Sequence, residues 1–350
     1  MSRRRRGVDG ERRDHGGQAG EEGERRWARG VLRVAYQILV QSDVEMYEAV
    51  LPLLSDSCEI HLWPEQEPPV DTDYAAIEGL YVYGHMWLDG ALMERMPRLR
   101  VISNFGVGCD HIDLDGARRL RIPVGNTPGV LDATTADMTF TLLMAAARNV
   151  VRGDHFARGP DFVEYDPSFM LGQEVAGSTL GIVGLGRIGY QVARRASGFD
   201  MEILYHNRNP NRRAEEELGA RYVSLEELMS TADFAILTMP LTRETRGMIG
   251  RRELGLMKPT AVLVNAARGA VLDHEALLAA LQEKRIHAAA LDVTEPEPLP
   301  RDHPLLAMEN VIIMPHLGSA TVQTRDAMAR MSVENLMAGL EGREVPYRIV

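Results

Sequence analysis

The stretch Thr179-Leu-Gly-Ile-Val-Gly-Leu-Gly-Arg-Ile-Gly189 decides the interpretation of the chain. An apolar, β-favouring run leads into three glycines spaced Gly-Xaa-Gly-Xaa-Xaa-Gly, and a segment of helical character follows them. The first glycine permits a tight turn, the second lets backbone amides approach a pyrophosphate, and the third lets the helix pack closely on the strand. The N-terminus of the helix adds positive partial charge. The stretch therefore predicts a dinucleotide site formed by Gly184, Gly186, Arg187, Ile188 and Gly189.

The strand expected at residues 202–206 ends in His206-Asn207-Arg208. Asn207 lies 18 residues after Gly189 (207 − 189 = 18), about where an NAD-binding chain would place a carboxylate on the adenosine ribose. Asparagine lacks the charge that would repel a 2′-phosphate, and Arg208 offers a guanidinium suited to bind one. The strand end therefore favours NADP (NADPH), contacted by Asn207 and Arg208. NAD is the alternative cofactor, with Arg208 as a solvated loop residue.

Outward from this stretch, short apolar runs alternate with segments of helical period from residue 31 onward. The alternation is typical of parallel sheets built from strand-helix-strand units, so we expect an α/β fold. Helices are expected at residues 130–151, where Asp132, Thr134 and Thr135 can cap the first turn, and at residues 321–340. Strands are expected at residues 31–40, 79–83, 99–104, 179–183, 202–206, 234–239, 261–265, 288–292 and 311–314.

The expected architecture is two doubly wound parallel-sheet domains of Rossmann or flavodoxin type, with a cleft between them. The helix at 130–151 would cross between the domains, and the C-terminal helix could return the chain to the first. Residues 31–128 and 320–350 would then form a discontinuous substrate-binding domain, and residues 129–319 an NAD(P)-binding Rossmann domain. Residues 1–30 mix Arg, Glu, Asp and Gly with almost no apolar content, which predicts a disordered tail.

Composition limits the classes of function. The 350-residue chain has a formal net charge of -11, which argues against a nucleic-acid or anionic-membrane partner. Its two cysteines, Cys58 and Cys109, form no pair or cluster with metal-ligand spacing, so we expect reduced thiols and no metal site. No apolar run approaches the roughly 20 residues that span a bilayer. Acidic residues within the Arg-rich start argue against a mitochondrial transit peptide, so a cytoplasmic location is expected.

Three further segments follow the glycine loop in order: Leu256-Met-Lys-Pro-Thr-Ala-Val-Leu-Val-Asn-Ala-Ala-Arg268-Gly, Leu291-Asp292-Val-Thr-Glu-Pro-Glu297-Pro298 and Met314-Pro315-His316-Leu-Gly-Ser-Ala320. With that loop they resemble the D-isomer-specific 2-hydroxyacid dehydrogenase family over about residues 31–350. Asp292-Val-Thr, Glu297-Pro-Leu-Pro and His316-Leu-Gly-Ser-Ala-Thr look closest to its glyoxylate/hydroxypyruvate reductase branch. The resemblance implies an NAD(P)-dependent enzyme that reduces small 2-keto acids, glyoxylate to glycolate or hydroxypyruvate to D-glycerate.

The resemblance also implies catalytic roles, and the chemistry of the side chains suits them. His316 would be the general acid, since imidazole titrates closest to neutral pH. Glu297 would hold the far nitrogen of that ring and fix its orientation. Arg268 would bind the carboxylate and carbonyl oxygen of the substrate with its guanidinium fork. Asp292 matches the position that orients the nicotinamide carboxamide.

Further matches extend the site on both sides. The loop from Asn104 to Asp113 resembles one whose backbone amides bind the substrate carboxylate through Val107 and Gly108, although a plain strand-to-helix turn would use the same glycines. The segment from Gly84 to Trp87 is expected to line the same pocket. Pro240, Thr242 and Thr245 resemble a cofactor-side loop, the alternative being a turn with a helix cap. Family members are commonly dimers through the nucleotide domain. We expect a homodimer in which the segment 133–148 provides the contact.

Two departures from the family leave the substrate open. Asp137 stands where many members have Glu, and residues 160–165 read Pro-Asp-Phe-Val-Glu-Tyr where mammalian glyoxylate/hydroxypyruvate reductases have a Trp-containing segment. A sugar acid such as 2-ketogluconate is the alternative substrate. A dinucleotide-sensing binding protein, like the C-terminal binding protein corepressors, is the alternative function, because those proteins keep the same Arg, Glu and His.

Overall fold

The computed structural model describes residues 35–42, 46, 48–54, 57–64 and 67–350. The expected disordered tail at 1–30 lies outside these residues, as do the first four positions, 31–34, of the expected strand 31–40. The residues from Tyr36 to Val350 form one compact unit. The unit contains two sheets whose strand pairs are all parallel, so the α/β fold class is confirmed.

The first sheet has the strand order β2-β1-β3-β4-β5, which is the flavodoxin-type doubly wound order. Both β3 and β4 are buried along their whole length, as expected for strands of a parallel sheet covered on both faces. The strands are β1 (Tyr36–Gln41), β2 (Cys58–Trp63), β3 (Gly79–Val82), β4 (Val101–Asn104) and β5 (Val124–Gly125).

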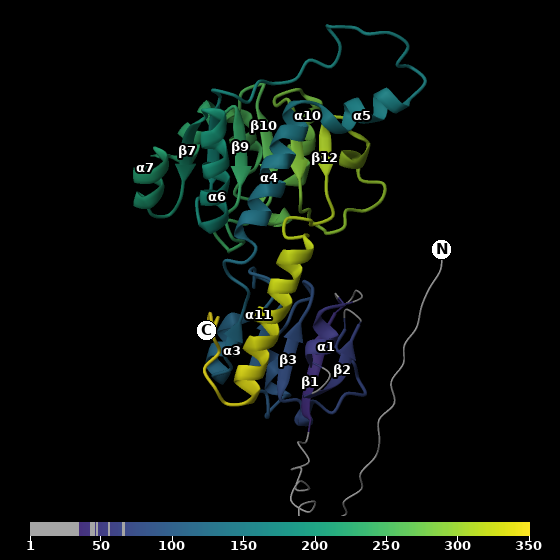
Figure 1. The fold of residues 1–350 in the computed structure, drawn as a ribbon, viewed down its shortest axis with the longest axis vertical. Coiled ribbons are helices and arrows are strands. Elements are labelled where there is room, and N and C mark those ends of the chain that lie inside the picture. Colours follow the sequence, from purple (N-terminus) through teal and green to yellow (C-terminus); the bar gives the residue numbers. More distant parts are fainter. Residues whose placement is uncertain (1–34, 43–45, 47, 55–56, 65–66) are drawn as a thin grey trace, which may run out of the picture. The chain divides into compact units, whose positions relative to one another are not determined.

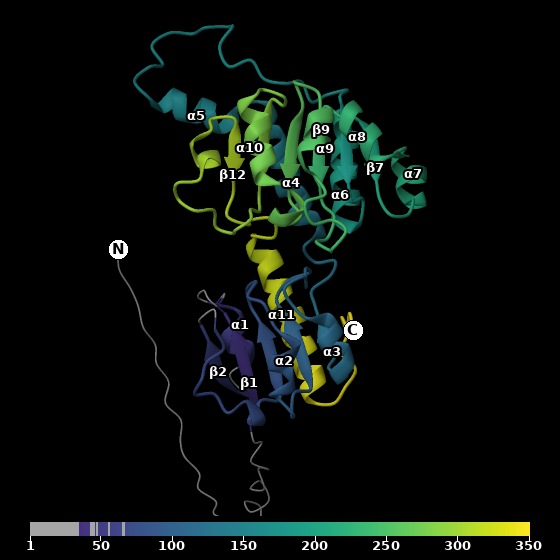
Figure 2. The same cartoon turned by 180° about the vertical axis from the view of Figure 1, so that it is seen from behind.

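Helices cover both faces of the first sheet (Figures 1 and 2). One face packs against α1 (Val50–Leu54) and α11 (Val322–Leu340), and the other against α2 (Gly90–Glu94) and α3 (Leu114–Leu120). A short 3-10 helix, η1 (Tyr74–Ala76), precedes β3.

The second sheet has the order β12-β11-β10-β9-β6-β7-β8. The chain reverses direction across the sheet between β6 and β9, the place where open α/β sheets bind ligands at the carboxyl ends of their strands. The strands are β6 (Thr179–Val183), β7 (Glu202–His206), β8 (Arg221–Tyr222), β9 (Phe234–Leu237), β10 (Val262–Asn265), β11 (Ala288–Leu291) and β12 (Val311–Ile313).

The second sheet is also covered on both faces. In Figure 1, α4 (Asp132–Ala147) and α6 (Arg187–Ala196) lie over one face, and Figure 2 shows α8 (Leu225–Thr231), α9 (Arg251–Leu256) and α10 (His274–Gln282) on the other. The connections contain α5 (Val150–Arg158), α7 (Arg212–Leu218), η2 (Ser197–Phe199), η3 (Gly269–Val271) and η4 (Pro304–Ala307).

The expected continuous helix at 130–151 is wrong in one respect. The helix α4 ends at Ala147 and α5 begins at Val150. Between them Asn149 has a left-handed backbone (φ 53°), a conformation that asparagine tolerates better than most residues, and its amide donates to the carbonyl of Met170. The expected side-chain cap is wrong too, since no side chain caps the first turn of α4 and Thr134 instead shares a hydrogen bond with Thr324 of α11.

The C-terminal helix α11 packs directly on the first sheet. The hydroxyl of Ser103 donates to the backbone carbonyl of Ser332 (2.6 Å), and the hydroxyls of Ser332 and Tyr81 share a hydrogen bond (2.8 Å). The approach of helix to strand is close, because a Cβ added at Gly339 would overlap the side chain of Val101 on β4. Glycine at this position therefore sets the distance between α11 and the sheet.

We predict that Gly339→Ala lowers the free energy of unfolding by about 1–3 kcal/mol, since overpacking forces helix and sheet apart. Gly255 in α9 is a matched control, because an added Cβ there meets nothing within 4 Å. Gly255→Ala should leave stability unchanged or raise it by up to about 1 kcal/mol through helix propensity. Urea unfolding of both variants measures the difference. Equal stability of the two variants would contradict the close packing at Gly339.

Candidate active site

The glycine loop connects β6 to α6 at the point where the second sheet reverses. Gly184 has φ +97° and a Cβ there would strike the backbone of Met239, while a Cβ at Gly189 would lie 2.9 Å from the carbonyl oxygen of Gly184. Gly186, at the N-cap of α6, has no atom within 4 Å of such a Cβ and the helix has no side-chain cap. The N–H of Gly186 donates to the carbonyl of Gly184 (2.8 Å). The open space in front of the uncapped amides of Arg187 and Ile188 fits the pyrophosphate of a dinucleotide.

Asn207, just after β7, is tied to this loop. Its Oδ1 accepts the backbone N–H of Leu185 (2.7 Å) and its Nδ2 donates to the carbonyl of the same residue (3.1 Å). Both polar atoms of the side chain thus hold the glycine loop in shape. An aspartate at this position could not make the second of these bonds, which is a structural reason for asparagine that the sequence analysis missed.

Arg208 is exposed at the end of the same strand connection. A hydrogen bond from Thr242 lowers the pKa of the nearby carboxyl of Glu244, and the positive charges of Arg208 and Arg243 lower it further. Two arginines therefore lie near the strand end, where the sequence predicts a 2′-phosphate. The neighbouring loop is a closed turn, in which Thr245 donates its hydroxyl to the carbonyl of Pro240 (2.7 Å) and accepts the N–H of Thr242 (2.8 Å).

Asp292 follows β11 and is buried, with 2% of its surface exposed. Its two carboxylate oxygens accept the backbone N–H groups of Leu317 (2.7 Å) and Gly318 (2.8 Å), and its carbonyl accepts that of His316 (2.9 Å). His316 itself has a left-handed backbone with φ 58°, a conformation that costs free energy unless the surrounding structure enforces it. The hydrogen bonds of Asp292 hold this backbone conformation, so Asp292 fixes the loop that carries His316.

His316 and Glu297 form a hydrogen-bonded pair. The Nδ1 atom of His316 lies 2.7 Å from Oε1 of Glu297, and the two side chains are 29% and 35% exposed. Burial alone would raise the pKa of Glu297, but the hydrogen bond and charge of His316 outweigh it and the pKa is lowered. An ionised Glu297 requires a proton on Nδ1. The Nε2 atom of His316 is then the nitrogen left to exchange a proton with a ligand.

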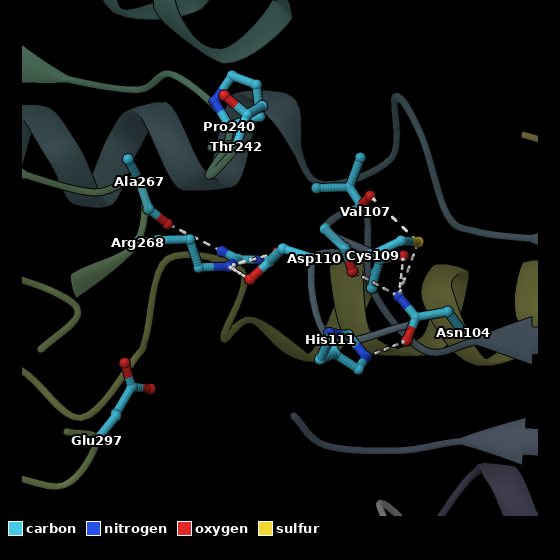
Figure 3. A network of polar contacts seen from close by, with 12 residues as sticks. Asn104, Val107, Cys109, Asp110, His111, Pro240, Thr242, Ala267, Arg268 and Glu297 are labelled. Atoms are coloured by element: carbon cyan, nitrogen blue, oxygen red, sulfur yellow. Dashed lines mark hydrogen bonds and ion pairs between the residues drawn. The ribbon is translucent and has the colours of Figure 1, made fainter. Parts of the chain in front are cut away.

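Arg268, which follows β10, forms an ion pair with Asp110, which follows β4 of the other sheet (Figure 3). Its Nε lies 3.0 Å and 3.2 Å from the two carboxylate oxygens, and its Nη1 donates to the carbonyl of Ala267. A Cβ at Gly108 would overlap Nη2 of Arg268, so the guanidinium lies directly against this glycine of the loop after β4. The structure thus brings the predicted residues Gly108 and Arg268 into contact.

Three residues of this region were missed by sequence reasoning: Asn104, Asp110 and His111, shown with Arg268 in Figure 3. Asn104 donates to the carbonyls of Gly106 (3.0 Å) and Gly108 (2.8 Å) and thereby shapes the loop that carries Asp110. His85 lies in the segment after β3 that the sequence placed at the pocket, and its ring stacks on His316 with centroids 5.0 Å apart. The available signal for the three missed residues was their place at the carboxyl end of β4, where Asn104 ends the strand, or in the loop that follows it.

One ligand atom each from His85, Glu297 and His316 lie within 4.8 Å of one another. A histidine pair with a carboxylate is a donor set that transition metals accept. The hydrogen bond between Glu297 and His316 gives the same cluster a different explanation. The sequence-based expectation of no metal site stays a prediction.

The comparisons agree with the geometry. Residues 140–318 match the family model described as D-isomer specific 2-hydroxyacid dehydrogenase, NAD binding domain. The chain is 46% identical to the glyoxylate reductase of Aeropyrum pernix over 310 residues, which covers 86% of this chain and 92% of that protein. It is 45% identical to the glyoxylate reductase of Thermococcus gammatolerans, covering 86% and 92%.

A solved structure is similar throughout. The NADPH-dependent glyoxylate/hydroxypyruvate reductase of Sinorhizobium meliloti, in complex with NADP and malonate, superposes with a TM-score of 0.82 at 34% identity and covers 90% of this chain and 97% of that chain. Among the described residues, no helix is both long and apolar enough to cross a membrane.

Proposed function

Because the chain belongs to the D-isomer-specific 2-hydroxyacid dehydrogenase family of oxidoreductases, we propose that it reduces glyoxylate to glycolate and hydroxypyruvate to D-glycerate, with NADPH as the preferred cofactor. The observation that carries the proposal is the hydrogen-bonded His316–Glu297 pair, on loops that follow parallel strands. Both members of the pair and Arg268 act electrostatically on the same ring, that of His85. Relatives named glyoxylate reductase support the first substrate. The Sinorhizobium meliloti structure supports the second substrate and the cofactor.

The bound nicotinamide cofactor supplies the hydride. The residues of the chain bind the keto acid and provide the proton. Arg268 binds the carboxylate and carbonyl oxygen, helped by the backbone amides of Val107 and Gly108, and favours the negative charge that develops on that oxygen. His316 donates the proton from Nε2 to the oxygen. Glu297 holds the opposite nitrogen, so the ring carries a proton in the right orientation.

We also propose that the two sheets have separate tasks. Residues 31–128 with 320–350 would bind the substrate and residues 129–319 the dinucleotide, in the cytoplasm. The packing of α11 on β4 and the glycine loop after β6 support this division. A homodimer through α4 is supported by the exposed apolar side chains of the neighbouring segment, which include Val150, Val151, Phe162, Val163, Tyr165 and Leu171.

The first test is a panel of glyoxylate, hydroxypyruvate, pyruvate and 2-ketogluconate with NADPH and NADH, measured for wild type and His316→Ala. We expect the substitution to lower kcat by about two to four orders of magnitude, as for loss of a general acid, with little change in cofactor affinity. His155→Ala, an exposed histidine of α5, is the control. Unchanged kcat in His316→Ala would remove His316 from the mechanism, and preferred turnover of 2-ketogluconate would replace the substrate.

Glu297→Gln should lower, by about one unit, the pH above which reduction fails. The protonated imidazole of His316 loses its anionic partner and gives up its proton more readily. The lowered pKa of Glu297 means that the partner is ionised in the working range. The measurement is kcat/KM for glyoxylate as a function of pH. Glu295→Gln, two residues away and exposed, is the matched control. Superimposable profiles for Glu297→Gln and wild type would show that the pairing does not affect catalysis.

Arg208→Ala should weaken NADPH binding about 10- to 100-fold, the loss expected for a charge-assisted hydrogen bond to a phosphate, and change NADH binding by less than about two-fold. Fluorescence titration of the two cofactors measures both affinities. Arg158→Ala, whose partner is Asp154 on α5, controls for the loss of one positive charge. Wild-type protein that binds NADH as tightly as NADPH would refute the cofactor preference.

A further inference from the structure

The site contains a further histidine, His85, to which the proposed mechanism gives no role. Its ring lies parallel to that of His316, with centroids 5.0 Å apart and planes inclined by 9°. Its other neighbour is His111, whose ring stands edge-on at 88° with centroids 5.2 Å apart. The side chain of His85 is exposed, so a ligand can reach it.

The hydrogen bonds of Asn104 fix the proton on His111. Asn104 donates from Nδ2 to the carbonyls of Gly106 and Gly108, which identifies Oδ1 as its acceptor. The contact between Oδ1 and Nε2 of His111 (3.1 Å) therefore requires a hydrogen on Nε2. Nδ1 of His111 is then a bare acceptor. It is buried in a residue that is 6% exposed, and it has no partner among the described residues.

The ring of His85 stands edge-on to that of His111 with centroids 5.2 Å apart, so it is a neighbouring polar side chain that can face this acceptor. Desolvation of the ring and the charges of Arg268 and His316 lower the pKa of His85 to about 4, so it is neutral near pH 7 and has one N–H and one bare nitrogen. A buried acceptor without a donor is costly, which favours the rotamer and tautomer of His85 that turn the N–H toward His111. The remaining nitrogen of His85 is then an acceptor.

The ring position brings a nitrogen of His85 to the reacting end of the site. One of its ring nitrogens lies within 4.8 Å of the ligand atoms offered by His316 and Glu297. A 2-keto acid with its carbonyl oxygen at His316 and its carboxylate at Arg268 has one further substituent, the group on the keto carbon. An acceptor beside His316 can recognise a hydroxyl on that group.

We propose that His85 selects the substrate by accepting a hydrogen bond from a hydroxyl on the carbon next to the keto group. The chain then favours 3-hydroxylated 2-keto acids, of which hydroxypyruvate is the smallest, over unsubstituted ones such as pyruvate. This inference rests on the proposed function, since it assumes a 2-keto acid at Arg268 and His316. It makes His85 a specificity residue that does not transfer the proton.

Hydroxypyruvate and pyruvate test the proposal because they differ only by the hydroxyl at carbon 3. His85→Phe keeps an aromatic ring to stack on His316 but has no acceptor, and His85→Gln keeps an acceptor without the ring. We expect the ratio of kcat/KM for hydroxypyruvate to that for pyruvate to fall roughly ten-fold in His85→Phe, the scale of one hydrogen bond. The ratio should recover at least in part in His85→Gln. His155→Phe on α5 is the control.

Equal losses on both substrates in His85→Phe would overturn the proposal, because they would mean that His85 acts only through His316. Unchanged kcat/KM for both substrates would overturn it as well, and in either case wild-type turnover leaves the proposed function standing. Absence of wild-type turnover with every keto acid of the panel would refute the proposed function, and this inference with it.

Discussion

All strand pairs in the two sheets are parallel, and this constraint determines where chemistry can occur in the chain. Parallel strands need crossover connections, so the carboxyl ends of neighbouring strands meet at the same edge of the sheet. The loops at those edges carry Asp110 after β4, Arg268 after β10 and Asp292 after β11. Arg268 and Asp292 come from the neighbouring strands β10 and β11 of one sheet in this way. Asp110 comes from the other sheet, and its ion pair with Arg268 joins residues that are 158 positions apart.

The site is held by polar groups whose partners are mostly backbone atoms. Asp292 uses both carboxylate oxygens on the loop of His316, and Asn207 uses both amide atoms on the glycine loop. The Nε of Arg268 is engaged by Asp110, so the keto-acid carboxylate that we propose for this site must share the guanidinium with Asp110 or displace it. This arrangement keeps the charge of Arg268 paired before substrate arrives, since an unpaired, partly buried guanidinium would be costly.

Local patterns in the sequence predicted the α/β fold class and the glycine loop. The features that these patterns missed depend on contacts between residues far apart in the sequence. The glycine spacing was informative because Gly184 and Gly189 meet backbone atoms that any side chain would strike. The sequence placed the segment from Gly84 to Trp87 at the substrate pocket, but no local pattern singles out His85 within it, because its ring stacks on a ring 231 residues away (316 − 85 = 231). The break at Asn149 was missed for a similar reason, because apolar residues resume at Val150 and a single left-handed residue ends the helix. The two-residue strands β5 and β8 are too short to show a periodicity.

The return of α11 to the first sheet has a consequence for how the chain is made. Synthesis proceeds from the N-terminus, so the strands of the first sheet leave the ribosome early, whereas the helix that covers one of their faces is among the last segments to appear. Ser103 and Tyr81 cannot form their hydrogen bonds to Ser332 until α11 has been synthesised. The apolar face around Val101 stays uncovered while the whole second sheet is synthesised. The second sheet, whose strands and covering helices are continuous in sequence, can complete its core first. The nascent first sheet is thus the part of this protein that most needs protection from aggregation before release.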